Sequence, residues 1–179
     1  FTHQILSQKL KDHEIKRLYL AFIYGCLDPA FGRIEKNIIR SRNNRLKMVA
    51  VRNLGRIAIT NYETKKVFLN GGISLVECRL ETGRTHQIRA HFKYIGHPLF
   101  NDDTYGGDRI LKGTSFTKYK QFIENCFALL PHQALQAKSL GVVHPSNRKN
   151  LVFDSELPSG FIALLDKWRS YASYHETNE

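Results

Sequence analysis

The chain of 179 residues has the length of a single domain, and its 42% hydrophobic content is enough to build a core. Its 27 Lys and Arg residues outnumber the 16 Asp and Glu residues, and the resulting net charge of +11 favours an anionic partner such as nucleic acid. No apolar stretch is long enough to span a bilayer, and no signal peptide is recognisable at the start of the sequence. The three cysteines are widely spaced and indicate neither a disulfide framework nor a zinc site. We therefore expect a cytoplasmic protein without a membrane partner.

The first part of the chain is expected to form a helix and then strands. No capping residue precedes the helix, which indicates that the chain starts inside a larger domain. Residues 17–24 are apolar on both faces, as in a strand within a sheet. Further strands are expected at residues 57–62, 65–69 and 73–81, with a hairpin turn at residues 70–72. The apolar positions that recur at helical spacing in the first helix are Phe1, Ile5, Leu6 and Leu10.

Residues 36–56 form an unbalanced run with seven basic residues and no acid. Asn and Ser lie between the basic residues, and the run lacks the apolar helical face that would anchor it in a membrane. These features are typical of a surface that follows a nucleic-acid backbone. The basic residues are Lys36, Arg40, Arg42, Arg45, Lys47, Arg52 and Arg56.

Residues 81–91 carry two arginines, two histidines and an amide side chain where a strand gives way to a helix. The helix is expected at residues 84–95, with Thr82 or Thr85 as its cap and Gly96 at its end. Cations beside a helix N-terminus form an anion site, and phosphate suits arginine best. Taken by itself, the segment also fits a surface helix with solvated basic residues.

The remaining elements mix helices and strands without regular alternation. After a loop at residues 101–107 we expect a helix at 116–130, capped by Thr114 or Ser115. A buried strand at 134–143 and a short strand at 151–154 follow. This order predicts the α+β class, a mixed, mostly antiparallel sheet with packed helices. The apolar face of a last helix is formed by Phe161, Leu164, Leu165 and Trp168.

Several motifs resemble those of pseudouridine synthases, most closely the RluA/RluD type that modifies large-subunit ribosomal RNA. The first is ETGRTHQIR at residues 81–89, followed by GHPL at 96–99 and DDTYG at 102–106. RLYLA at 17–21 and QALQA at 133–137 fall in the family's order. The resemblance covers essentially the whole chain and implies one catalytic domain, residues 1–179, with a pseudouridine synthase-like fold.

The resemblance implies an enzyme that isomerises uridine within RNA and needs neither a metal nor an organic cofactor. By its place in the motif, Arg89 would pair with a catalytic aspartate and keep it charged, and Tyr19 would lie against the uracil ring. The implied partner is large-subunit ribosomal RNA, and we expect a monomer. The residues expected to bind RNA are Arg84, His86 and Gln87 of the motif and Arg40, Arg42 and Arg45 of the basic run.

The resemblance also implies that the nucleophile lies outside this sequence. The family's catalytic aspartate belongs to an Arg-Leu-Asp segment before the tyrosine strand, and no such segment occurs here. Neither Asp102 nor Asp103 matches its position. We therefore expect a truncated catalytic domain that is inactive alone, from an active parent protein.

Two other functions fit parts of the sequence. The first is an RNA-binding module without catalytic activity, which an Arg-Leu-Asp segment upstream would argue against. The second is a metal-independent ribonuclease that uses His86 and His91.

The same two histidines are also spaced like two metal ligands on a helix. The glutamate and the third ligand of such a metal site are missing from the motif, which argues against metal binding.

Overall fold

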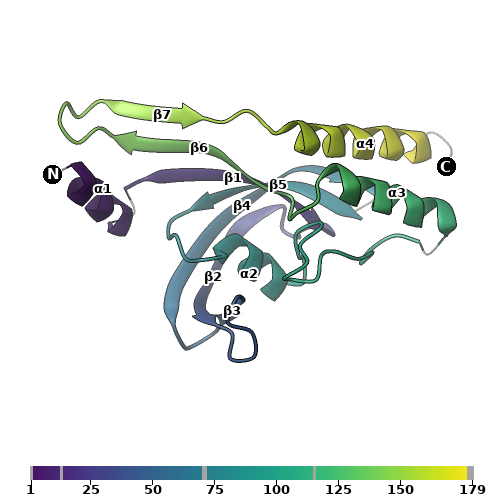
Figure 1. The fold of residues 1–179 in the computed structure, drawn as a ribbon, viewed down its shortest axis with the longest axis horizontal. Coiled ribbons are helices and arrows are strands. Elements are labelled where there is room, and N and C mark those ends of the chain that lie inside the picture. Colours follow the sequence, from purple (N-terminus) through teal and green to yellow (C-terminus); the bar gives the residue numbers. More distant parts are fainter. Residues whose placement is uncertain (1, 13, 70–71, 115, 177–179) are drawn as a thin grey trace.

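The computed structural model describes residues 2–12, 14–69, 72–114 and 116–176. In the described residues seven strands form one sheet, in the order β3-β2-β4-β5-β1-β6-β7, and every neighbouring pair is antiparallel (Figure 1). The strands are β1 (Lys16–Tyr24), β2 (Phe31–Arg40), β3 (Met48–Val51), β4 (Arg56–Phe68), β5 (Ile73–Leu80), β6 (Leu135–Val143) and β7 (Asn150–Asp154). The predicted α+β class with a mostly antiparallel sheet is confirmed.

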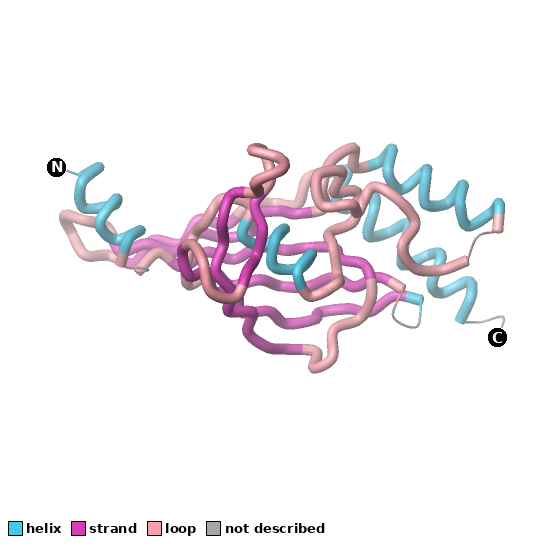
Figure 2. The backbone as a smooth tube through the Cα atoms, turned by 90° about the horizontal axis from the view of Figure 1, so that it is seen from below, coloured by secondary structure: helices cyan, strands magenta, loops and turns pink. Residues whose placement is uncertain are grey.

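The helices lie on both faces and at one end of the sheet (Figures 1 and 2). None of the helices in the described part of the chain is long and apolar enough to cross a membrane. Their bounds are α1 (Thr2–Lys11), α2 (Gln87–Tyr94), α3 (Thr117–Leu129) and α4 (Ser159–Glu176).

The interior strand β1 separates two cores because its side chains alternate between the two faces of the sheet. Phe22 and Tyr24 point into a core that α3 and α4 cover. Ala21 and Ile23 point to the opposite face, where α2 packs. The burial of both faces explains why residues 17–24 show no polar alternation.

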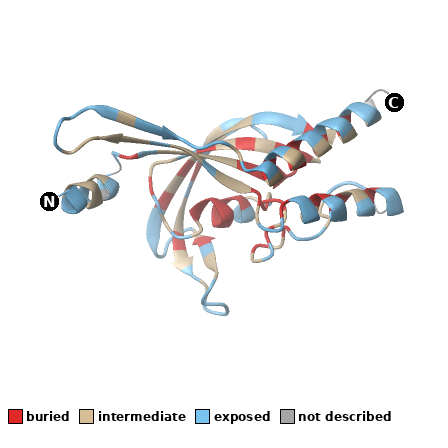
Figure 3. Ribbon diagram, turned by 45° about the horizontal axis from the view of Figure 1, so that its top comes forward, coloured by how far each residue is buried: buried red, intermediate tan, exposed pale blue. Residues whose placement is uncertain are grey.

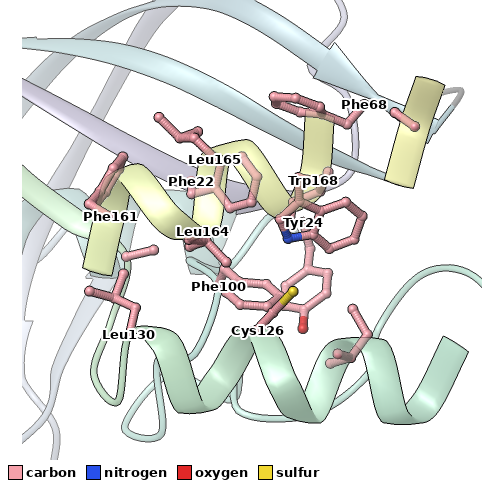
Figure 4. Packing of buried hydrophobic residues seen from close by; sticks show 14 of the residues in the cluster. Phe22, Tyr24, Phe68, Phe100, Cys126, Leu130, Phe161, Leu164, Leu165 and Trp168 are labelled. Carbon is pink, nitrogen blue, oxygen red and sulfur yellow. The ribbon is translucent and has the colours of Figure 1, made fainter. Parts of the chain in front are cut away.

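The larger core is rich in aromatic rings. Trp168 of α4 lies edge-on to Phe22 of β1 and to Phe100, with ring centroids 6.0 and 6.1 Å apart (Figure 4). The predicted apolar face of the last helix is confirmed, since all four of its residues are buried. The buried apolar face of α4 therefore packs on the side of β1 opposite to α2.

The smaller core holds α2 in place. Ile88 and Phe92 pack against the sheet, and six of the eight residues of α2 are buried (Figure 3). Gly96 has a φ of 86° and follows the helix, as expected for a residue that ends a helix in the left-handed region. The side chains at the start of α2 are therefore fixed on the sheet.

Several expectations about local structure were wrong. Strands β2 and β3 were not expected, although β3 and the second half of β2 lie within the basic run. The strands expected at 57–62 and 65–69 belong to one strand, β4, which ends at Phe68 and has a register shift between Thr64 and Lys66. The strand at 134–143 is only partly buried, because β6 lies one strand from the edge of the sheet. Asn70 and Gly71 of the expected hairpin turn lie outside the described residues.

The expected helix caps were also wrong. His86 precedes α2 and Phe116 precedes α3, and neither makes a capping hydrogen bond through its side chain. Thr82 is buried and bonds elsewhere. Ser115 lies outside the described residues.

Candidate active site

The connection from β5 to α2 is held by a buried amide, Gln87. Its Oε1 accepts hydrogen bonds from the Thr82 hydroxyl and the Arg84 backbone N–H, at 2.7 and 3.0 Å. Its Nε2 donates to the Ile59 carbonyl and to Thr60 Oγ1 on β4, at 2.9 and 3.1 Å. All four hydrogen-bonding positions of the amide are occupied, and the residue is 2% exposed.

Gln87 therefore fixes the start of α2 to the sheet. Its expected contact with RNA is corrected by this geometry, since neither side-chain atom is free or accessible. The residue still serves the site, because it sets the position of its neighbours on the motif.

His91 lies one turn further along α2 and is fully buried. The Lys36 carbonyl can only accept, so a neutral His91 carries its proton on Nε2, and its Nδ1 accepts from the Thr60 hydroxyl 2.9 Å away. His91 Nε2 then donates to the Lys36 carbonyl at 3.4 Å. Burial lowers the pKa of His91 to about 4. A neutral histidine with no access to solvent cannot act with His86 on RNA, which removes the structural basis of the ribonuclease alternative.

Arg89 makes a buried bidentate ion pair with Asp102. Its Nε and Nη2 donate to the two carboxylate oxygens at 2.8 and 2.7 Å. Asp102 is 0% exposed and also accepts from the Tyr105 backbone N–H at 3.1 Å. Burial alone would lower the pKa of Arg89, but the hydrogen bonds and charge of Asp102 outweigh burial and raise it. The guanidinium is therefore charged and fixed in orientation.

The ring of Tyr105 joins this pair to the basic run. The guanidinium carbon of Arg89 lies 4.9 Å from the ring centroid, and Lys47 Nζ lies 5.2 Å from it. The Tyr105 hydroxyl accepts from the Met48 backbone N–H at 2.9 Å. An aromatic ring between two cations suits a site that concentrates positive charge.

His86 completes the cluster and is neutral. Its backbone has a φ of 53°, which is uncommon for a residue other than glycine and turns the chain into α2. Arg89 Nη1 lies 3.3 Å from His86 Nε2, and because arginine only donates, Nε2 accepts. His86 Nδ1 then carries the proton and donates to the Tyr105 hydroxyl at 3.1 Å. Burial, followed by the charge of Arg89, lowers the pKa of His86.

The turn between β2 and β3 presents the basic run next to this cluster. Arg40 donates to the Arg45 carbonyl across the turn, and both side chains are exposed together with Arg42. Arg40 lies opposite Met48 in the β2–β3 ladder, and the Met48 N–H bonds to the same Tyr105 hydroxyl as His86. The charge of Arg40 also contributes to the lowered pKa of His86. The structure thus brings Arg40, His86 and Arg89 into one electropositive cluster.

Tyr19 lies on the α2 face of β1, in line with Ala21 and Ile23. It is partly buried and lines a pocket of about 290 Å³ between β1 and the β6–β7 hairpin. Arg84, in the connection before α2, donates through Nε to the Ile57 carbonyl at 3.1 Å and keeps the rest of its guanidinium for other partners. Tyr19 is thus on the face of the sheet that α2 covers, and Arg84 lies in the connection that leads into α2.

Two residues of the site were missed by sequence reasoning. Asp102 does not match the expected position of a nucleophile, and the motif alone does not indicate its pairing with Arg89. The sequence also does not decide whether Tyr105 shapes the pocket or anchors its loop. The DDTYG motif contains both residues and was the signal that could have found them. Among the described residues, no three His, Cys, Asp or Glu side chains come together as metal ligands.

Comparison with known proteins agrees with these motifs. Residues 1–94 match the sequence model of a family described as RNA pseudouridylate synthase. The chain is 39% identical to RNA pseudouridine synthase 2, chloroplastic, of Oryza sativa subsp. japonica, over 93% of this chain and 39% of that protein. It is 36% identical to ribosomal large subunit pseudouridine synthase D of Neisseria meningitidis serogroup B, over 92% of this chain and 41% of that protein.

A solved structure shows the same fold. Human RNA pseudouridylate synthase domain containing 4 superposes with a TM-score of 0.65 at 22% identity, covering 93% of this chain and 67% of that one. The chain spans about two fifths of the length of the two curated relatives named above. On the extent of the family match and the identity to these relatives, the chain belongs to the RNA pseudouridylate synthase family, in its RluA-type branch.

Proposed function

We propose that the protein is an RNA pseudouridine synthase that converts uridine to pseudouridine in large-subunit ribosomal RNA. The observation that carries the proposal is the fixed, buried guanidinium of Arg89 within the ETGRTHQIR motif. Membership of the family and the relatives named for large-subunit modification support it. The proposal includes a monomer in the cytoplasm, although the name of the rice relative places that protein in the chloroplast.

The reaction needs no cofactor because substrate and product are isomers. The bond from N1 of uracil to C1′ of the ribose breaks, and a bond from C5 to C1′ forms. The proton on C5 leaves and N1 gains one, so no electrons are exchanged with a second substrate. The protein has to supply a nucleophilic carboxylate, a proton acceptor and a pocket for a base turned out of the RNA.

Arg89 is proposed to orient that carboxylate. A guanidinium has five N–H donors, and three are directed to Asp102 and His86. Two remain for a second carboxylate, which the adjacent positive charge would keep ionised. Asp102 is fully engaged and buried, so the proposed nucleophile is an aspartate from outside these 179 residues.

Tyr19 and the basic residues are proposed to bind the RNA itself. The Tyr19 ring would stack on the uracil, and its hydroxyl could accept or donate a proton in the C5 step. The exposed arginines of the β2–β3 turn would follow the RNA backbone towards Arg84 and His86. Direct contact with large-subunit RNA is part of the proposal.

The first test compares the 179 residues with the complete protein from which they come. We expect the complete protein to release the C5 hydrogen of uracil from ribosomal RNA, and the 179-residue chain to bind RNA without releasing it. Release by the chain alone would contradict the absence of its nucleophile. Binding without release by the complete protein would favour the alternative, an RNA-binding module without catalytic activity.

The second test concerns the β2–β3 turn. Replacing Arg42 and Arg45 together with glutamine should raise the dissociation constant for RNA by about tenfold and reduce the salt dependence by about 0.7 for each phosphate that is no longer bound. The matched control replaces Lys118 and Lys120 with glutamine, which removes the same charge from the exposed side of α3. Equal effects in the two variants would remove the turn from the RNA-binding surface.

A further inference from the structure

Arg17 of β1 has two guanidinium nitrogens without a hydrogen-bond partner in the part of the chain that the structure describes. These two atoms, Nε and Nη2, are buried. Burying an unpaired charge is costly, so proteins normally place an acceptor beside it. The chain carries this cost at a position two residues from Tyr19 and on the same face of β1.

The charged side chains described around Arg17 do not neutralise it: Arg84 is also positive, and Asp154 already has a partner. Burial lowers the pKa of Arg17, and the charge of Arg84 lowers it further, while Tyr19 acts in the opposite direction. Asp154, across the adjacent pocket, is paired with Lys138 at 3.0 Å. The group that neutralises Arg17 is therefore not found in this part of the chain.

Gly83 shapes the space around the guanidinium. A Cβ built on Gly83 would lie 2.1 Å from Arg17 Nη1, closer than any real contact. The backbone of Gly83 is not in the left-handed region, so an alanine there would meet only the arginine. The glycine of the motif is thus needed for Arg17 to lie against the β5–α2 connection.

Arg17 and Tyr19 line the same pocket of about 290 Å³. The pocket is also lined by Phe153 and Leu140 and by the Lys138–Asp154 ion pair, so that Arg17, which has no such partner there, borders an apolar, aromatic wall. A nucleotide has the matching chemistry, with a flat base for the rings and a phosphate for the cation.

We infer that Arg17, together with Arg84, binds the RNA phosphate next to the nucleotide whose base lies against Tyr19. The inference rests on the proposed function, since it takes RNA as the substrate, and assigns to Arg17 a role that the motif residues do not fill. Two neighbouring arginines fit a phosphate, which offers several oxygens at once. A protein carboxylate would pair with the guanidinium of only one of the two arginines and leave the charge of Arg84 without a counterion.

The test measures binding of the 179-residue chain to a fluorescein-labelled oligouridylate by anisotropy over a range of KCl concentrations. Arg17→Met should raise the dissociation constant about fivefold and reduce the salt dependence by about 0.7, the value for one single-strand phosphate. Gly83→Ala should weaken binding in the same direction without changing the charge. Adding Gly83→Ala to Arg17→Met should have no further effect, because the arginine it displaces is already absent.

The control is Arg169→Met, which removes one charge from α4, where Arg169 pairs with Asp166. Equal binding by Arg17→Met and Arg169→Met, or a fully additive effect of Gly83→Ala, would overturn the inference. Loss of turnover in the complete protein with unchanged RNA binding would also overturn it and would point to a carboxylate partner. If the complete protein makes no pseudouridine but Arg17→Met still weakens binding, the proposed function fails and the phosphate site stands.

Thermal unfolding provides a second measurement. Because two guanidinium nitrogens of Arg17 are buried without a partner among the described residues, Arg17→Met should raise the midpoint of unfolding by about 2–4 °C without RNA. A lower midpoint would show that Arg17 has a structural partner and would contradict the inference.

Discussion

Replacing Asp102 with alanine is expected to lower the free energy of unfolding by about 3–5 kcal/mol, the range for removing one partner of a buried ion pair. The substitution would leave the Arg89 guanidinium buried, without the two hydrogen bonds at 2.7 and 2.8 Å that now satisfy it. It would also free the Tyr105 backbone N–H. The loss is large because a charge that stays inside the protein has neither its partner nor water.

Asp103→Ala is the matched control, since it removes a carboxylate one residue away that is exposed and bonds only within its own turn. Urea unfolding monitored by circular dichroism would measure both variants, and Asp103→Ala should lose less than about 1 kcal/mol. A second variant, Asp102→Ala with Arg89→Met, should recover part of the loss because the unpaired charge is gone. Similar stability of the two single variants would show that the ion pair contributes little.

The pairing of Arg89 illustrates what the sequence could and could not predict. The motif and the helix starting near it were found from local pattern, and the resemblance to a family implied that Arg89 pairs with a catalytic aspartate. Its partner in the structure is 13 residues further along the chain and reaches it only because the loop after α2 turns back. A contact of this kind depends on tertiary packing, which spacing along the sequence does not encode.

Gln87 and β2 show how polar composition misled the sequence reading. Gln87 stands among charged residues and was expected to bind RNA, yet α2 packs it against β4, where it bonds to two residues of that strand. In β2, Ile34 and Ile38 are buried on one face, whereas Arg33 and Glu35 are exposed on the other, which is the pattern of a strand. The density of basic residues directed attention to a nucleic-acid surface and hid this alternation.

The elements that were predicted correctly are those whose pattern is set by a core. The last helix was recognised because its apolar residues return every three to four positions, and all four are buried in α4. Residues 17–24 were recognised because both faces of β1 are covered. Of the expected site residues, Arg40, His86 and Arg89 come together in the structure. The roles of these three, like those of Tyr19, Arg42, Arg45 and Arg84, remain predictions.

The buried histidine of α2 leads to a pH dependence of stability. His91 has a pKa of about 4 in the folded chain, chiefly because of burial, against about 6.5 when unfolded. The unfolded state therefore binds the proton more readily, so stability contributed by neutral His91 is present above about pH 6.5 and is lost as the pH falls towards 4. Between about pH 8 and pH 4.5 the expected loss from this residue is about 2–3 kcal/mol.

Urea unfolding of the chain and of His91→Gln at these two pH values would isolate this contribution. Glutamine can accept from Thr60 and donate to the Lys36 carbonyl, as His91 does, but it does not titrate. Carboxylates that protonate near pH 4.5 are common to both proteins and cancel in the difference. His91→Gln should therefore lose about 2–3 kcal/mol less than the original chain on acidification.

His132→Gln is the control for this experiment, because His132 is exposed and bonds only to its neighbour's carbonyl. It should lose as much stability as the original chain. If His91→Gln behaves like His132→Gln, then His91 accepts a proton in the folded chain without penalty. The hydrogen-bonded path from Gln87 through Thr60 and His91 to Lys36 would then not hold the tautomer deduced from the structure. The link between α2 and the basic strand β2 would have to tolerate a charged imidazole.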